Sequence, residues 1–166
     1  MVVSSTDLAW AAGIIDGEGT VRLNHGLRNT NRTEIFTPII AVNNTDIRMV
    51  VKLKEMFGGS IHVSGGKYPY QYKGAIRRRK VTHMWTVCAD AALATAESLK
   101  PYLVCKKEQA EKLLLFYKMK RQRGGKMNAH GIVDPALKTA NDEKLKHQRK
   151  LFEELKAMHH EGEYTI

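Results

Sequence analysis

The sequence predicts one α+β domain in which helices alternate with pairs of antiparallel strands. Three observations predict this class: a short apolar helix that ends in a glycine-rich turn, two pairs of strand-like segments, and an amphipathic helix after each pair. A chain of 166 residues is long enough to bury a core. We expect the order helix, two strands, helix, two strands, helix, helix in a single domain spanning 1–166, with its core at about 5–121 and a C-terminal loop and helix at 122–160.

The first helix is predicted within DLAWAAGIIDGEGT, which spans residues 7–20. Gly17 and Gly19 favour a turn, so the helix is expected to end at Asp16 and to leave Glu18 just beyond its end. Two carboxylates therefore lie where an apolar helix stops. The alternating oxygen ligands and the distal Glu of an EF-hand loop are missing, which excludes that type of calcium site.

Small side chains gather on one face of this helix. Ala9, Ala12, Gly13 and Asp16 follow the i, i+3, i+4, i+7 spacing of a single helical face. Such a face allows two helix backbones to approach closely. The alternative is a helix that packs on a sheet and is followed by a glycine-rich turn, and composition alone does not choose between them.

Positive charge is concentrated in the middle of the chain. The whole sequence carries 27 Lys and Arg against 17 Asp and Glu, a net charge of +10. Residues 61–126 hold 15 basic and 4 acidic residues, a local excess of +11, whereas the segments on either side are close to neutral. An excess confined to one segment favours a polyanionic partner such as nucleic acid.

The two cysteines, Cys88 and Cys105, lie in apolar contexts and belong to no CxxC pair. We expect both to be reduced core residues, without a zinc site. No signal peptide and no membrane-spanning run is recognisable, so we expect an intracellular protein of the cytoplasm, nucleoid or an organelle.

Two strands are predicted at 20–27 and 34–43, forming a hairpin with one apolar and one polar face. Pro38 indicates that the second strand is an edge strand, bulged or short. A two-stranded ribbon fits the major groove of DNA, so the polar face could contact bases or phosphates. A solvated sheet face is the alternative. The residues of this region proposed to contact DNA are Arg22, Asn24, Arg28, Arg32 and Thr37.

A second helix is predicted to run to about Phe57, because Asn44-Thr45-Asp46 can cap its start and Gly58-Gly59 can end it. A second pair of strands is expected at 60–63 and 81–89, with Trp85 and Val87 in the core.

Between these strands lies GGKYPYQYKGAIRRRK, in which tyrosines alternate and a run of cations follows. Tyrosines beside a basic run suit contact with bases and phosphates. The segment is longer than a tight hairpin requires, so we expect an extended excursion that orders on nucleic acid. A solvated basic run is the alternative. The candidate DNA-binding residues here are Tyr70, Tyr72, Lys73, Arg77, Arg78, Arg79 and Lys80.

Three more helices are predicted: one at 91–99, one from Lys106 to about Arg121, and an amphipathic helix at about 142–158 after a glycine-rich basic loop at 122–139. His159 and His160 are expected to form a frayed tail.

The segment AAGIIDGEG, residues 11–19, resembles the LAGLIDADG motif of homing endonucleases and intron maturases. The residues Ala12-Gly13, Ile15-Asp16 and Gly19 match the motif, and Glu18 stands where the motif has its final Asp. The segments VNNTDIRMVVKLKEMFGGSI and LKPYLVCKKEQAEKLL are similar to other parts of that family. The resemblance implies the αββαββα fold, with an antiparallel sheet forming a DNA-binding saddle and an added C-terminal helix.

The resemblance also implies roles for individual residues. Glu18 would bind a divalent metal with the Gly17 carbonyl, and Lys106 would reach the active centre. Asn44 and Arg48 would organise water and phosphate, although Arg48 could equally be a surface residue, as could Lys106 without the motif. Ala12, Gly13 and Asp16 would belong to the motif helix that crosses its copy in a partner.

A single copy of the motif implies that two identical chains supply the two halves. The implied protein is a homodimeric homing endonuclease, encoded in an intron or intein, that uses Mg²⁺, or Mn²⁺ in its place, to hydrolyse both strands of a long near-palindromic DNA site. An intron RNA maturase is one alternative, with intron RNA as its partner. A non-catalytic DNA-binding regulator on the same scaffold is the other.

Overall fold

The computed structural model describes residues 3–28, 34–65, 69–78, 80–118 and 135–159. The elements, in chain order, are α1 (Ser5–Glu18), β1 (Gly19–Leu27), β2 (Glu34–Asn44), α2 (Ile47–Phe57), β3 (Ser60–Ser64), β4 (Pro69–Tyr72), β5 (Ala75–Arg78), β6 (Thr82–Cys88), α3 (Ala89–Leu99), α4 (Lys107–Lys118) and α5 (Pro135–Met158). The predicted α+β class and the order of the main elements are confirmed.

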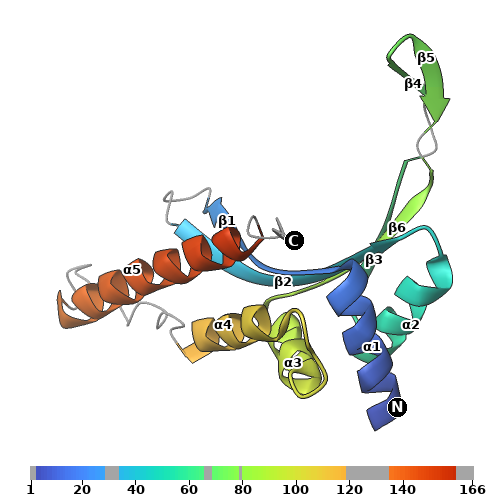
Figure 1. Ribbon diagram of the computed structural model, residues 1–166. Helices are drawn as coiled ribbons and strands as arrows, with labels where there is room; N and C mark the ends of the chain where they lie inside the picture. The colour runs from blue at the N-terminus through green and yellow to red at the C-terminus, as the bar shows by residue number, and fades with distance from the viewer. Residues whose placement is uncertain (1–2, 29–33, 66–68, 79, 119–134, 160–166) are drawn as a thin grey trace, which may run out of the picture.

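Four strands form one antiparallel sheet in the order β1-β2-β6-β3, and the helices lie on one side of it (Figure 1). Gly19 pairs with Val42 across β1 and β2, and Ser60 pairs with Thr86 across β3 and β6. The two predicted strand pairs are therefore halves of a single sheet, with its other side left uncovered by helices.

The core lies between this sheet and the helices. The predicted alternation in the strands is confirmed, because Val21 and Leu23 are buried while Arg22 and Asn24 between them are exposed. Trp85 is completely buried, and its indole nitrogen donates a hydrogen bond to the Gly58 carbonyl at 2.8 Å. A buried indole needs such a partner, and this one fixes the end of α2 to β6.

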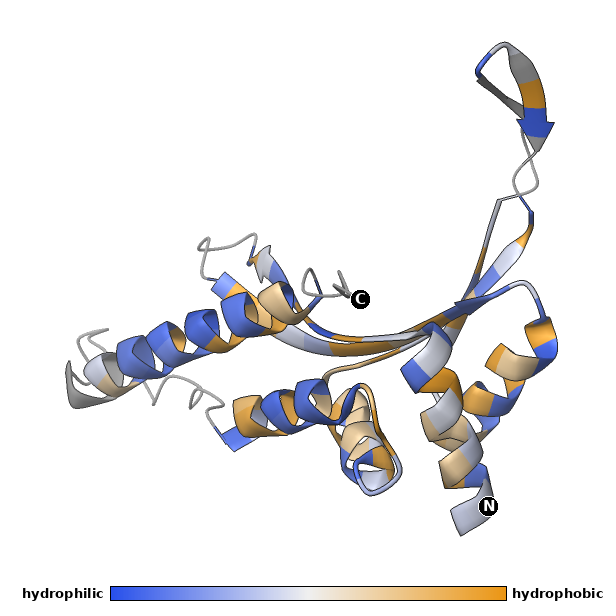
Figure 2. Cartoon of the chain, in the orientation of Figure 1, coloured by the Kyte–Doolittle hydropathy of each residue, from blue (hydrophilic) through white to orange (hydrophobic). Residues whose placement is uncertain are grey.

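The amphipathic pattern of the helices agrees with this arrangement. Figure 2 shows apolar turns in α1 and α2 and a largely hydrophilic α5. The side chain of Asp46 caps α2 by accepting a hydrogen bond from the Arg48 backbone nitrogen, which confirms the predicted start of that helix.

Two predicted boundaries are wrong. Helix α1 continues to Glu18 rather than ending at Asp16, because Gly17 keeps helical geometry and the Gly19 nitrogen still donates to the Ile15 carbonyl. Helix α5 begins at Pro135 rather than near Asp142. Proline fits the first turn of a helix, where its missing N–H would have no partner in any case.

The prediction that Pro38 marks an edge, bulged or short strand is wrong for β2 as a whole but correct at Pro38 itself. β2 is 11 residues long and lies between β1 and β6. Its pairing with β6 begins only at Ile39, so at Pro38 the strand has β1 as its single neighbour. The proline is tolerated in a central strand because the sheet is locally narrower there.

Both cysteines were expected in the core, and both are exposed. Cys88 ends β6 on the side of the sheet that the helices leave uncovered, and Cys105 lies in the connection before α4. His159 is not frayed, since its Nε2 lies 3.2 Å from the Val21 carbonyl oxygen. His160 lies outside the described residues, as do the predicted end of the fourth helix at 119–121 and most of the loop at 122–139.

The predicted excursion after β3 is a second antiparallel sheet, made of β4 and β5, which stands away from the four-stranded sheet (Figure 1). Lys73 and Gly74 join the two strands with φ angles of 50° and 78°. Positive φ at both residues of a two-residue loop is the geometry of a type I′ turn, which matches the twist of a β-hairpin. We call β4, β5 and this turn the β4–β5 ribbon.

Candidate active centre and nucleic-acid interface

The C-terminal end of α1 presents the last acid of the motif to solvent. Glu18 is the final residue of the helix and is exposed. The next residue, Gly19, begins β1, and a Cβ atom there would lie 2.6 Å from the Ile15 carbonyl oxygen. Only glycine allows the strand to leave the helix at this distance, and the turn that results fixes where Glu18 emerges.

Asp16 ties this helix end to the connection between α3 and α4. Its two carboxylate oxygens accept hydrogen bonds from the backbone nitrogens of Val104 and Lys106, each at 2.8 Å. The side chain of Lys106 then donates to the Asp16 carbonyl oxygen. Asp16 therefore braces the end of its helix, and the groups it binds belong to a distant segment rather than to that helix.

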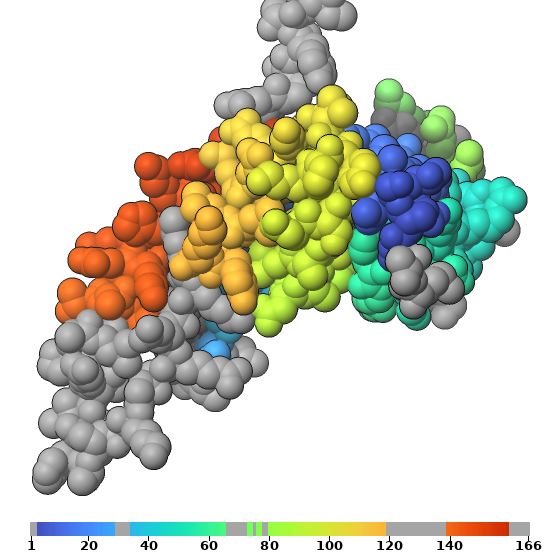
Figure 3. All heavy atoms as spheres, turned by 90° about the horizontal axis from the view of Figure 1, so that it is seen from below, coloured from blue at the N-terminus to red at the C-terminus, as the bar shows by residue number. Residues whose placement is uncertain are grey.

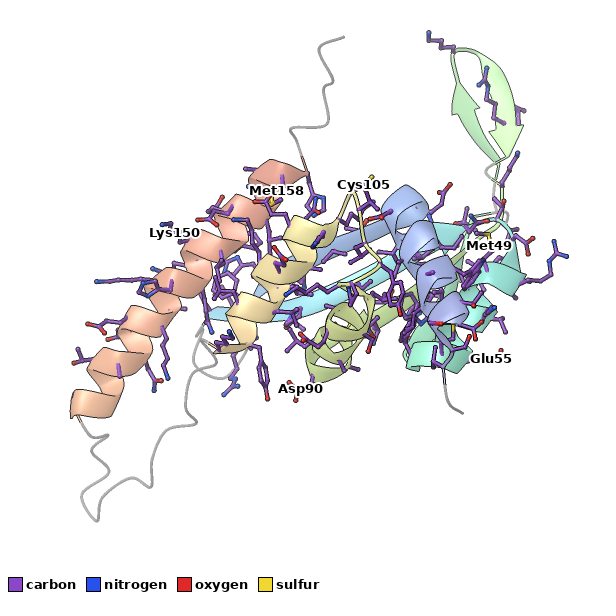
Figure 4. The ribbon with its side chains drawn as sticks, turned by 60° about the horizontal axis from the view of Figure 1, so that its bottom comes forward. Met49, Glu55, Asp90, Cys105, Lys150 and Met158 are labelled. Carbon is purple, nitrogen blue, oxygen red and sulfur yellow. The ribbon has the colours of Figure 1, made fainter. Side chains whose placement is uncertain are left out.

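Lys106 consequently lies at the same helix end as Glu18. A cation there is favourable, since the carbonyls of the last turn carry the negative end of the helix dipole. Figure 4 shows the connection that carries Cys105 passing beside the C-terminal end of α1. The structure thus brings the ammonium group of Lys106 to the helix end that bears Glu18. The two residues lie 88 positions apart in the sequence.

The small-residue face of α1 is only partly where the sequence placed it. Ala12 was predicted at an interface between chains, but it is completely buried in the chain's own core and has no surface to offer. Ala9, Gly13 and Gly17 are exposed, and a Cβ atom added at Gly13 or Gly17 would meet nothing within 4 Å. α1 lies at the surface between α2 and α3 (Figure 3). We call Ala9, Gly13 and Gly17 the α1 strip.

Asn44 and Arg48 are engaged with Asp46 at the start of α2. The side-chain oxygen of Asn44 accepts a hydrogen bond from the Asp46 nitrogen at 2.8 Å. The guanidinium of Arg48 binds both carboxylate oxygens of Asp46, and its hydrogen bonds lower the pKa of that carboxyl to about 2. The Arg48 side chain is 87% exposed. No hydrogen bond or ion pair joins either residue to Glu18 or Lys106 in the part of the chain that the structure describes.

The uncovered side of the four-stranded sheet carries polar residues predicted to contact DNA. We call it the open face. Arg22 and Asn24 lie between buried residues of β1, and Asn24 pairs with Thr37 of β2. All three residues therefore belong to one continuous surface, because side chains alternate between the two sides of a strand. Arg28 is exposed just beyond β1, and Arg32 lies outside the described residues.

The β4–β5 ribbon extends this region away from the helices. Lys73, Arg77 and Lys80 are exposed. The backbones of Tyr70, Tyr72 and Arg78 belong to the ribbon, but their side chains lie outside the described residues, as does the whole of Arg79. No acidic residue occurs between Glu55 and Asp90, so both strand pairs of this half of the chain are free of negative side chains.

Sequence reasoning left out one polar residue of the open face. Asn43 is exposed, and it follows Val42, the partner of Gly19 in the sheet. It therefore lies at the end of the sheet where α1 passes into β1. The signal was available, since the alternation that puts Thr37 on the polar face continues through Ile39 and Ala41 to Asn43.

Among the described residues, no group of three or more His, Cys, Asp and Glu side chains is placed to hold a metal ion. In the same residues, none of the helices has the length and hydropathy needed to cross a membrane.

No model of a protein family matches the sequence, and no curated protein matches it. Solved structures do. The homing endonuclease I-CvuI, solved in complex with its target in the presence of calcium, has a TM-score of 0.64 and 18% identity over 97% of this chain and 87% of its own. The homing endonuclease I-TnaI has a TM-score of 0.58 and 16% identity over 93% of this chain and 96% of its own.

A third match is to a longer chain. The LAGLIDADG homing endonuclease I-SmaMI, bound to cleaved DNA, has a TM-score of 0.59 and 14% identity, with 88% of this chain covering 42% of its own. At these identities the likeness establishes the architecture. The chain therefore has the LAGLIDADG homing endonuclease fold, as the motif at residues 11–19 predicted.

Proposed function

We propose that this chain is a site-specific DNA endonuclease that acts as a homodimer and hydrolyses one phosphodiester in each strand of a long, near-palindromic duplex. The observation that carries the proposal is the pair of hydrogen bonds that the Asp16 carboxylate accepts from the backbone nitrogens of Val104 and Lys106, which holds Lys106 at the helix end where Glu18 is exposed. An acid and a fixed cation beside an open, basic sheet suit attack on an anionic diester. The DNA-bound structures of I-CvuI and I-SmaMI support the same reading.

The dimer is supported by a helix surface that the single chain leaves uncovered. The α1 strip has no partner within the chain at Gly13 and Gly17, although a helix surface of this kind suits close contact with a second helix. I-SmaMI, of which this chain covers 42%, is long enough to hold two such units. Two identical chains would form a two-fold interface along the α1 strip and would require two-fold-related half-sites in the DNA.

A divalent metal fits the donors at this position. Glu18 offers an exposed carboxylate, and Gly17 offers a carbonyl whose intrahelical partner would be Val21, a residue already in β1. Hard oxygen donors suit Mg²⁺, with Mn²⁺ as a substitute. One chain provides a single carboxylate here, so a second copy would supply the other. The bound ion would promote ionisation of a water and stabilise the leaving oxygen.

The chain's own residues would do the rest. Lys106, held by Asp16, would offset the negative charge that develops on the phosphate in the transition state. The open face and the β4–β5 ribbon would hold the duplex, with Arg22, Asn24 and Thr37 towards the groove. Asn44 and Arg48 would organise water and phosphate, which requires Arg48 to exchange Asp46 for a phosphate oxygen. That exchange is chemically direct, because a phosphate accepts the same paired hydrogen bonds as a carboxylate.

The experiment that tests the proposal is a cleavage assay with and without Mg²⁺. A plasmid library carrying random inserts, or the uninterrupted host locus where it is known, is incubated with the wild-type chain and with Glu18→Gln. We expect double-strand breaks at a selected sequence only for the wild type with Mg²⁺. Glu18→Gln should bind the same DNA without cutting it, because an amide is a poor metal ligand.

Other outcomes would replace the proposal. Sequence-specific binding without cleavage by the wild type would indicate a DNA-binding regulator. Preferential binding of a structured intron RNA over duplex DNA would indicate an intron maturase. Cleavage by Glu18→Gln at the wild-type rate would show that the active centre lies elsewhere.

A further inference from the structure

One apolar residue of the β4–β5 ribbon is exposed to solvent. The Ile76 side chain in β5 is 79% exposed, whereas the isoleucines at positions 15 and 40 of the core are almost completely buried. Figure 2 shows an apolar band in β5 beside hydrophilic residues, on a ribbon that no helix approaches. Two strands alone have no second layer on which to bury such a side chain. Contact with another molecule would bury it.

The surroundings of Ile76 indicate which kind of molecule this is. Arg77 follows it directly, Lys73 lies at the turn of the ribbon, and both are exposed. The nearest acidic residues in the sequence are Glu55 and Asp90. Such a ribbon attracts phosphate groups, and its two-stranded width fits the major groove. Phosphate contacts alone do not distinguish one sequence from another.

We propose that Ile76 contacts the C5 methyl group of a thymine in the major groove, once in each half-site. It thereby sets a preference for thymine at that position. The proposal rests on the DNA-binding function above. The methyl group is the one apolar feature of the base edges in that groove, and only thymine presents it. The competing explanation is that Ile76 merely favours the strand conformation of β5, as β-branched residues do.

The first measurement is a selection of binding sites from a randomised duplex library. It is done in calcium, the ion present with the I-CvuI complex, for the wild type, Ile76→Ala and Ile76→Thr. Thr keeps the β-branched shape that favours a strand and one methyl group, but it replaces the longer arm of the isoleucine with a hydroxyl. We expect the wild type to select thymine at one symmetric pair of positions, Ile76→Thr to weaken that preference and Ile76→Ala to lose it, with other positions unchanged. If Ile76→Ala keeps the preference, the apolar side chain does not set it and the proposal is wrong.

The second measurement removes only the methyl group. Each thymine of the selected duplex is replaced in turn by deoxyuridine, and affinity is measured at constant salt. Burying one methyl group suggests about a fourfold loss per half-site for the wild type at the pair of positions that Ile76 contacts. Ile76→Ala should show no loss there. Equal losses for the wild type and Ile76→Ala would overturn the proposal.

A matched control separates this contact from exposed apolar surface in general. Val63 in β3 is 64% exposed and belongs to the same half of the chain, but it pairs with His83 on the side of the sheet that carries buried Trp85. Val63→Ala should leave the thymine preference intact. A wild type that selects no sequence at all would instead refute the DNA-binding function itself, so the two failures are distinguishable.

Discussion

The C-terminal end of α1 and the β4–β5 ribbon are built in opposite ways. The helix end is held by two hydrogen bonds that the Asp16 carboxylate accepts from backbone nitrogens and by one that the Lys106 side chain donates to the Asp16 carbonyl, above a core that buries Ile15. The ribbon is held by its own strand pairing and a type I′ turn, with Ile76 in solvent. Groups that must meet a reacting phosphate need a fixed position, whereas groups that follow a groove need reach.

The largest expected effect is a loss of cleavage rate when the helix end is changed, without a comparable loss of DNA affinity. Lys106→Met should lower the cleavage rate by about 10²–10³, the range seen when one group that stabilises a transition state is removed. DNA affinity should change far less. Lys107→Met is the matched control, since Lys107 is adjacent but exposed at the start of α4. Single-turnover cleavage with saturating enzyme measures the effect. Equal rates for the two variants would assign no catalytic role to Lys106.

The ribbon should show the opposite behaviour. Replacing Arg77, Arg78 and Arg79 together by Gln should reduce the slope of log affinity against log salt by about 3, because each lost phosphate contact removes about 0.9. Cleavage of DNA that is already bound should persist. The control replaces three basic residues of α5 on the helix side of the sheet, Lys144, Lys146 and Lys156. If the control changes the slope as much, the ribbon is not the principal phosphate-binding element.

A third prediction tests how firmly the helix end is held. Asp16→Asn puts an amide donor opposite one of two backbone N–H groups, so it should lower the free energy of unfolding by about 1–3 kcal/mol. Denaturant titration measures this. Glu97→Gln on the exposed side of α3 should change stability by no more than about 0.5 kcal/mol. Wild-type stability for Asp16→Asn would mean that the helix end does not depend on these bonds.

A fourth prediction tests whether two chains dimerise through the α1 strip. Gly13→Leu enters open space in the single chain, so folding should be little affected. Across the proposed interface it overpacks two copies of the α1 strip, at about 1–3 kcal/mol for each substitution. Sedimentation should show a weaker dimer than for Ala157→Leu, an equally exposed position near the end of α5. Unchanged dimerisation would place the interface on another surface.

The smallest effect concerns the end of the sheet remote from α1. Glu34 binds Arg149, and that hydrogen bond lowers the pKa of the Glu34 carboxyl. The pair therefore stabilises the fold at pH values above 4.5, the ordinary pKa of this carboxyl. The stabilisation is lost as the pH falls through the lower pKa that the carboxyl has in the folded chain. Exposed pairs contribute about 0.2–1 kcal/mol.

The measurement is the free energy of unfolding of Glu34→Gln and of wild type as a function of pH. The two curves should differ at pH 7 and converge as the pH falls below about 4. Glu153→Gln, an exposed acid on α5, should follow the wild type throughout. A difference that persists in acid would point to a contact other than the ion pair.

The sequence predicted local features well where a residue type has one usual structural role. Asp46 caps α2, Trp85 is in the core, and the alternation in β1 and β2 assigns their faces correctly. The same alternation, carried further along β2, would have found Asn43. The turn at Lys73-Gly74 was also available, since an L-residue followed by glycine between two strands suits a type I′ turn.

The errors have a common physical cause. Ala12 and the cysteines were assigned from their immediate neighbours, yet whether such residues are buried depends on which elements pack against them. Pro38 correctly indicated an edge at its own position, but one residue could not show that β6 pairs with the rest of the strand. Gly17 was read as a helix end although glycine is also tolerated in a last turn. The meeting of Asp16 with residues 104 and 106 depends on the tertiary fold, and only the family resemblance pointed to Lys106.

The Asp16 side chain binds the backbone, not the side chains, of the connection before α4. This determines which substitutions the connection tolerates. Backbone N–H groups are the same for every residue except proline, so Val104 and Cys105 can be replaced widely while Lys106 keeps its position. Length is another matter. Inserting or deleting one residue between the two donors would bring a different side chain to the helix end. The segment is thus permissive in composition and strict in spacing.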